Sequence, residues 1–251
     1  MRLVTCTLAQ RGDPGRAGWR TLDSAWTAFM HLAPTGGLYY GTPAFAEHML
    51  LAFTEADPTT VVARAATVPF RQPRRADGTP FGLPDDGWDE VIRWAAEDQL
   101  TGACPDTVAS VEVAVRQDVR HRGWGAQMIT AMKDNARRLG FGAFVAPVRP
   151  MAKHRQPDVP MAEYVSWMRA DGLPADPWLR AHARLGGRIV RLAPTSTVIA
   201  SNLATWRRVT ELPFDRSGPV LVPGALVPVH VSVEHDYAVY VEPAVWMRHE
   251  L

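Results

Sequence analysis

Two arginines and two glycines follow a valine-rich segment in the middle of the chain. Val108–Val115 reads VASVEVAV, and Arg120-His121-Arg122-Gly123-Trp124-Gly125 stands a few residues later, directly before an amphipathic segment. A helix N-terminus offers unpaired backbone N–H groups and the positive end of the helix dipole. Glycine lets the backbone approach a phosphate closely. The pattern predicts an anion site suited to a pyrophosphate, although glycines that serve turn geometry alone would give the same pattern.

The turn differs from the two common nucleotide-binding loops. It has neither the Gly-x-Gly-x-x-Gly pattern of dinucleotide-binding proteins nor the Gly-Lys-Ser/Thr ending of a Walker loop. Both departures argue against a nucleotide cofactor of either kind.

Strand and helix patterns alternate around this turn. Val108–Val115 predicts a strand, Ala126–Leu139 a helix that ends at Gly140, and Phe141–Val148 a further strand. This β-α-β order predicts a mixed α/β sheet.

The rest of the chain supplies the other elements. We expect strands at Arg2–Ala9, Thr59–Phe70, Arg188–Leu192 and His230–Val241, and helices at Trp88–Leu100, Pro177–Leu185 and Leu203–Glu211. A helical region interrupted by a loop is expected over Thr21–Phe53, with exposed loops at Arg71–Asp86 and Arg149–Asp176. The second of these loops is long enough to border a substrate.

Composition excludes several classes of function. Hydrophobic residues make up 47% of the 251 residues, charged residues 21%, and the formal net charge is +1. The chain lacks the basic balance of a nucleic-acid binder, an apolar run that spans a bilayer and a Cys/His cluster with zinc spacing. The two cysteines are expected to be free thiols. These features predict a cytoplasmic protein of one domain over residues 1–251, without a metal site.

The central segment resembles motif A of the GNAT superfamily of acyl-CoA-dependent N-acyltransferases. The resemblance rests on Val113-x-Val115 followed by Arg120-x-x-Gly123-x-Gly125, with Gln117 in place of the usual proline. Trp178–Gly187 resembles the family's motif B, and the likeness covers about residues 59–192, the expected core. It implies the GNAT fold, a mostly antiparallel mixed sheet with splayed central strands. It also implies that acetyl-CoA, or another acyl-CoA, is held by Val113, Val115, Arg120, His121, Arg122, Gly123, Trp124, Gly125 and Ala126.

Three side chains are candidates for proton transfer. His182 stands where the family often has a tyrosine acid, although Gly187 replaces the usual aromatic of that motif. Glu112 lies within a valine-rich strand and is a candidate base, although it would equally well face solvent or pair with an arginine. Tyr164 would serve as an acid if its loop folds over the acyl site. A surface role for His182 is an equal alternative.

The resemblance implies transfer of an acetyl group to a small-molecule amine. Arg149, Lys153, His154 and Arg155 follow the last central strand, where basic side chains suit a carboxylate or phosphate on the acceptor, or form a solvated loop. His230, His235 and Glu242 show no spacing that compels a role. A malonyl-thioester decarboxylase and a CoA-binding module without transfer are the alternative functions, and a homodimer is compatible with the sequence.

Overall fold

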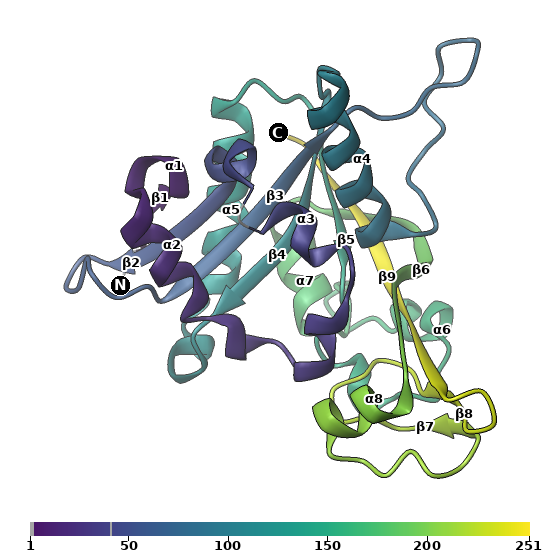
Figure 1. The fold of residues 1–251 in the computed structure, drawn as a ribbon. Helices are drawn as coiled ribbons and strands as arrows, with labels where there is room; N and C mark the ends of the chain where they lie inside the picture. The colour runs from purple at the N-terminus through teal and green to yellow at the C-terminus, as the bar shows by residue number, and fades with distance from the viewer. Residues whose placement is uncertain (1–2, 41) are drawn as a thin grey trace.

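A nine-stranded sheet runs through the molecule, with helices on both of its faces (Figure 1). The structure, a computed structural model, describes residues 3–40 and 42–251. The strand order is β1-β2-β3-β4-β5-β9-β8-β7, and β6 also pairs with β9. Within the described residues, only β4 and β5 run parallel, and the other pairs are antiparallel. The predicted mixed, mostly antiparallel sheet is confirmed.

The elements have the following bounds. The strands are β1 Leu3–Thr7, β2 Met49–Thr54, β3 Ala63–Phe70, β4 Thr107–Val115, β5 Phe144–Val148, β6 Arg188–Ser201, β7 Gly218–Val220, β8 Val229–Ser232 and β9 Tyr237–His249. The helices are α1 Leu8–Arg11, α2 Asp13–Arg20, α3 Gly36–Tyr39, α4 Gly87–Thr101, α5 Trp124–Arg138, α6 Met161–Ser166, α7 Pro177–Arg184 and α8 Leu203–Thr210. Short 3₁₀ helices are η1 Asp23–Ala25, η2 Ala28–Leu32, η3 Pro43–His48, η4 Gln117–Arg122 and η5 Lys153–Arg155.

The two central strands are covered on both faces. Every residue of β3 is buried, and so is nearly all of β4, as expected for strands that read as continuous apolar runs. Helix α4 packs on one face through Val91 and Ile92, and α5 packs on the other through Met128 and Ile129. Helix α5 ends at Arg138, and Gly140, two residues further on, has a φ of 86°, the left-handed conformation typical of a glycine that follows a helix.

The N-terminal segment, from α1 to η3, crosses the same face of the sheet as α4 (Figure 1). Short helices occupy most of the predicted helical region, but its last residues, Met49–Phe53, form β2. That part of the prediction was wrong, because a short and continuous apolar run fits a buried strand as well as a buried helix. Trp19, Leu22 and Phe45 anchor the segment in the core of this face.

The C-terminal strands are longer than the sequence pattern indicated. Strand β6 continues past Leu192 to Ser201, and β9 pairs with both β5 and β6. The predicted strand His230–Val241 is two strands, because residues 233–236 turn between β8 and β9 and Asp236 has a φ of 52°. Together with α8, these strands enclose a separate apolar cluster around Trp206.

The predicted Arg149–Asp176 loop is ordered by short helices and a buried lysine. It contains η5 and α6. Lys153 is fully buried, and its Nζ donates to the carbonyls of Gln156 at 2.6 Å and Leu226 at 2.8 Å. Its ammonium therefore fastens the loop to the C-terminal region. Within residues 3–40 and 42–251, no helix has the length and apolar character needed to cross a membrane.

Candidate active site

A cleft opens where β4 and β5 part. The two strands pair only at Val108 with Phe144 and at Ala109 with Val145. Beyond these pairs they diverge, and a cleft of about 860 Å³ is lined by residues 110–115 from β4 and 146–149 at the end of β5. Splaying leaves one backbone edge of β4 without a neighbouring strand, so N–H groups of this edge are open to a ligand. The carbonyls of Val111 and Val115 are already hydrogen-bonded, to Trp88 and Arg120.

A β-bulge decides which β4 groups face this gap. The N–H of Val108 donates to a carbonyl on the β5 side at 3.1 Å, whereas the N–H of Arg116 donates to one on the β3 side at 2.9 Å. In a regular strand the N–H groups of Val108 and Arg116 would point to the same side, because both residue numbers are even. The register shift between β3 and β4 inserts one extra residue in β4, so the N–H groups after it point to the opposite side. The N–H groups of Val113 and Val115 consequently point toward the gap.

The start of α5 opens into the same cleft. Gly123 precedes the helix with φ 73° and ψ 13°, a left-handed conformation that favours glycine, and no side chain caps the helix. Gly123, Gly125 and Ala126 line the cleft. A Cβ at Gly125 would lie 2.9 Å from the Trp178 ring, so this glycine allows α7 to approach α5. The two glycines thus serve different purposes, and the helix N-terminus keeps its open N–H groups.

The side chains of the turn brace it more than they extend into the cleft. Arg120 lines the cleft, and its guanidinium donates to the carbonyls of Val115 at 3.2 Å and Ala25 at 3.3 Å. The guanidinium carbon of Arg122 lies 5.6 Å from the Trp124 ring centroid. The Trp124 side chain is buried in the core and, among the described residues, is not part of the cleft lining. The side chain of the other predicted residue, His121, lies outside the described residues.

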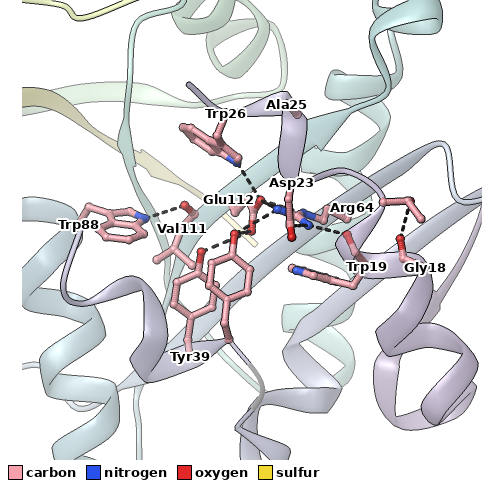
Figure 2. Close-up of polar contacts among 12 residues, drawn as sticks. Gly18, Trp19, Asp23, Ala25, Trp26, Tyr39, Arg64, Trp88, Val111 and Glu112 are labelled. Carbon is pink, nitrogen blue, oxygen red and sulfur yellow. Dashed lines mark hydrogen bonds and ion pairs between the residues drawn. The ribbon is translucent and has the colours of Figure 1, made fainter. Parts of the chain in front are cut away.

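Glu112 is buried in the cleft wall and surrounded by hydrogen-bond donors (Figure 2). Its Oε1 accepts from Trp26 Nε1 and Arg64 Nε, both at 2.9 Å, and its Oε2 accepts from Tyr40 at 2.8 Å and Tyr39 at 3.4 Å. A carboxylate has about four acceptor sites, so these donors fill them. The pairing with an arginine, weighed in the sequence as an alternative to catalysis, is the arrangement found.

Arg64 completes this buried cluster. The side chain is fully buried, and its Nη2 lies 2.7 Å from Glu112 while its Nη1 lies 2.5 Å from Asp23. The guanidinium also lies over the Trp19 ring at 4.9 Å. Burial alone would lower the pKa of Arg64, but the nearby Glu112 raises it, so the guanidinium stays charged. The cluster ties the N-terminal segment to β3 and β4.

His182 lies in the cleft wall and contacts a second histidine. Its Nδ1 is 2.9 Å from Nε2 of His249, which ends β9. Trp178 meets the His182 ring edge-on at 5.0 Å, and Phe144 meets the His249 ring edge-on at 5.4 Å. Burial, and then the neighbouring His249, lower the pKa of His182 to about 3, and burial lowers that of His249 to about 4. Both rings are therefore neutral at neutral pH.

The structure does not bring Tyr164 into the cleft. Its hydroxyl donates to Asp176 at 2.9 Å, and within the described residues it is absent from the cleft lining. Of the basic residues expected at the acceptor site, Lys153 is buried as described above, whereas Arg149 and His154 line the cleft. Arg149 is paired, because its Nε lies 2.9 Å from both oxygens of Glu242.

The sequence does not predict the position of Glu242 in the cleft, nor the aromatic residues that line it. Glu242 lines it from β9 and accepts from Arg149 and from Tyr240, at 2.5 Å for the tyrosine. Four aromatic side chains from the N-terminal segment and α4 also line the cleft and form its aromatic wall: Trp26, Tyr39, Tyr40 and Trp88. No spacing pattern links these residues to the central turn. Only the sheet order and the crossing N-terminal segment bring them together.

The fold belongs to the GNAT class. The chain superposes on the loading GNATL domain of CurA from Lyngbya majuscula with a TM-score of 0.59 and 14% sequence identity, over 99% of this chain and 96% of that one. At this identity the likeness concerns the fold. No family model matches the sequence.

A characterised relative supplies the family. The arginine N-acetyltransferase avaD of Aspergillus versicolor is 32% identical over 257 residues, which cover 92% of this chain and 87% of the relative. The chain therefore belongs to the GNAT superfamily of N-acetyltransferases, and it is an acyltransferase.

Proposed function

We propose that the protein transfers the acetyl group of acetyl-CoA to the amino group of a small molecule that carries a guanidinium, with arginine as the first candidate. The arginine N-acetyltransferase activity of avaD supports this acceptor. One observation supports acetyl-CoA as the acyl donor: the uncapped start of α5 opens into the gap between the splayed β4 and β5. A diphosphate joined to an extended arm fits a helix N-terminus beside a free strand edge.

The donor is expected to lie along β4. Backbone N–H groups at Trp124, Gly125 and Ala126 would hold the pyrophosphate with the help of the helix dipole. The N–H groups of Val113 and Val115 point toward the gap and would hold the pantetheine arm and the acyl carbonyl. The guanidinium of Arg120 donates to two main-chain carbonyls. It would therefore attract the pyrophosphate by its positive charge rather than by a direct hydrogen bond.

The acceptor is expected in the half of the cleft bounded by the aromatic wall and Glu242. Both carboxylates of the cleft, Glu112 and Glu242, are already paired with arginines. A guanidinium acceptor would therefore be held chiefly by the faces of Trp26 and Trp88 through cation–π attraction. We expect the acceptor to be small, because the N-terminal segment crosses this face of the sheet (Figure 1) and lines the cleft with Trp26, Met30 and Tyr40.

The reaction forms a C–N bond and breaks the C–S bond of the thioester. The neutral amine attacks the acyl carbon, the carbonyl oxygen gains negative charge, and the N–H of Val115 would stabilise that charge. The amine loses one proton and the departing thiolate gains one. Because His182 is neutral, it would act as an N–H donor at the cleft wall rather than as an imidazolium acid. The filled acceptor sites of Glu112 and the position of Tyr164 leave proton transfer to water in the cleft.

Two measurements test this function. A saturating acetyl-CoA concentration should raise the melting temperature, because a ligand at about 100 times its Kd adds about 2.7 kcal/mol to the unfolding free energy. Free-thiol release should then appear with arginine and be weaker with amines that lack a guanidinium. Thiol release with none of the amines, together with a clear acetyl-CoA shift, would indicate a binding module. CO2 release from malonyl-CoA without an amine would indicate the decarboxylase instead.

A further inference from the structure

His249 stands at the back of His182, away from the cleft. His182 lines the cleft, and its Nδ1 faces Nε2 of His249 at 2.9 Å. Within the described residues, His249 is not part of the cleft lining. We propose that His249 is a positioning residue, which donates its Nε2–H to Nδ1 of His182 and so fixes the tautomer in which His182 presents an N–H at Nε2 to the cleft.

Gly187 makes room for this partner. A Cβ at Gly187 would lie 2.7 Å from Cε1 and 2.8 Å from Nε2 of the His249 ring. The aromatic that the GNAT resemblance leads one to expect at this position is absent, and the His249 ring occupies the space beside it. The departure at Gly187 and the histidine at the end of β9 are thus two parts of one arrangement.

The buried environment of His249 selects the direction of the hydrogen bond. Its Nδ1 is buried and has no hydrogen-bond partner among the described residues. The carbonyl of Leu185 lies close enough to raise the pKa of His249, but it makes no hydrogen bond of good geometry to the ring, and it accepts from Nζ of Lys133 at 3.0 Å. A buried N–H without a partner is rarer in folded proteins than a buried acceptor that is left unsatisfied. The proton of His249 therefore belongs on Nε2, where His182 accepts it.

This tautomer matters for the transferase reaction, and in that respect the inference rests on the proposed function. A neutral imidazole with its proton on Nε2 donates a hydrogen bond to the oxygen or sulfur that gains charge. The opposite tautomer would present a lone pair there, which repels the same charge. Trp178 and Phe144 flank the pair, so neither ring turns freely. His249 would contribute without touching either substrate.

Imidazole ¹⁵N NMR of the full chain tests the tautomer directly. Pyrrole-type and pyridine-type ring nitrogens resonate far apart, and the His182→Phe variant assigns the signals. We expect Nε2 of His182 to be pyrrole-type and Nδ1 pyridine-type at neutral pH. A proton on Nδ1 of His182, or an averaged pair of signals, would overturn the proposal. This readout needs no acyl transfer, so it stands apart from any failure of the proposed function.

The kinetics of two His249 variants test whether the hydrogen bond to His182 affects turnover. His249→Gln keeps a donor N–H near the position of Nε2, whereas His249→Leu keeps volume without a donor. Because one donor to a developing charge contributes about 10²–10³ in kcat, we expect kcat to fall by about tenfold or more in His249→Leu, with little change in His249→Gln. KM for acetyl-CoA should stay constant in both. Equal losses of kcat in the two variants, at equal melting temperatures, would overturn the positioning role.

Discussion

Gly125 and Trp178 meet so closely that a Cβ on the glycine would lie 2.9 Å from Cζ3 of the indole. The contact joins the first turn of α5 to α7, which carries His182. It therefore places the expected phosphate site directly beside the wall of the acyl site.

Gly125→Ala should destabilise the protein by about 1–3 kcal/mol, because the added methyl group overpacks against a ring held by its own helix. It should also weaken acetyl-CoA binding, since α7 must move away from the start of α5. Urea unfolding and a thermal shift with acetyl-CoA measure the two effects. Gly142→Ala is the matched control, because a Cβ there meets nothing within 4 Å. If the two variants behave alike, the contact has no structural role.

Gly123→Asp tests the phosphate site by charge. Aspartate and asparagine both tolerate the left-handed conformation of Gly123, and both can cap a helix. The carboxylate, however, would stand beside a bound pyrophosphate, where like charges repel by several kcal/mol at an effective dielectric constant of about 20. We expect acetyl-CoA to bind about a hundredfold more weakly to Gly123→Asp than to Gly123→Asn. Equal affinity for the two variants, measured by calorimetry, would place the pyrophosphate elsewhere.

Glu112→Gln separates a structural carboxylate from a catalytic base. Arg64 is fully buried, and its charge would then depend on Asp23 alone, which is half exposed. Removing one partner of a buried pair costs about 3–5 kcal/mol, so we expect a loss of this order in the unfolding free energy.

The turnover of Glu112→Gln distinguishes the structural role from the catalytic one. A structural role predicts that kcat per folded molecule, measured well below the melting temperature, changes by less than about tenfold, since general acid–base catalysis contributes about 10²–10⁴. A stable Glu112→Gln protein with a turnover reduced beyond a hundredfold would instead make Glu112 the base.

The central β-α-β unit could be predicted because its signals are local. Each signal spans only a few residues: the apolar run of β4, the turn at Gly123 and the glycine that follows α5, Gly140. Continuous apolar runs were less informative, and for that reason β2 was expected as part of a helical region. The turn between β8 and β9 was missed because its residues carry no glycine or proline.

The partners of the site residues could not be predicted, because they come from distant parts of the chain. Glu112 meets Arg64 across the β3–β4 pairing and Trp26 from the crossing N-terminal segment. His182 meets His249 only because β9 lies beside β5 and ends near α7. Burial and pairing, rather than residue type, determine what each of these side chains can do.

His182→Phe should slow turnover while leaving acetyl-CoA affinity nearly unchanged. The phenyl ring keeps the packing against Trp178 but supplies no N–H to the cleft. Loss of one donor to a developing charge predicts a fall in kcat of about a hundredfold. Thiol-release kinetics and a thermal shift with acetyl-CoA measure the two quantities. Unchanged turnover would remove His182 from the mechanism, whatever its tautomer.

As the pH is lowered, three buried histidines should reduce the stability of the protein before most of its carboxylates take up protons. Burial lowers the pKa of His182 to about 3 and those of His48 and His249 to about 4, against about 6.5 in an unfolded chain. The unfolded state therefore binds more protons below about pH 6.5, so stability is complete above that pH and declines as pH falls toward 4, by up to about 1.4 kcal/mol per pH unit for each histidine. Urea unfolding at several pH values gives this slope. His182→Phe should reduce this slope by up to about 1.4 kcal/mol per pH unit, the contribution of one proton. An undiminished slope would show that His182 titrates normally in the folded protein.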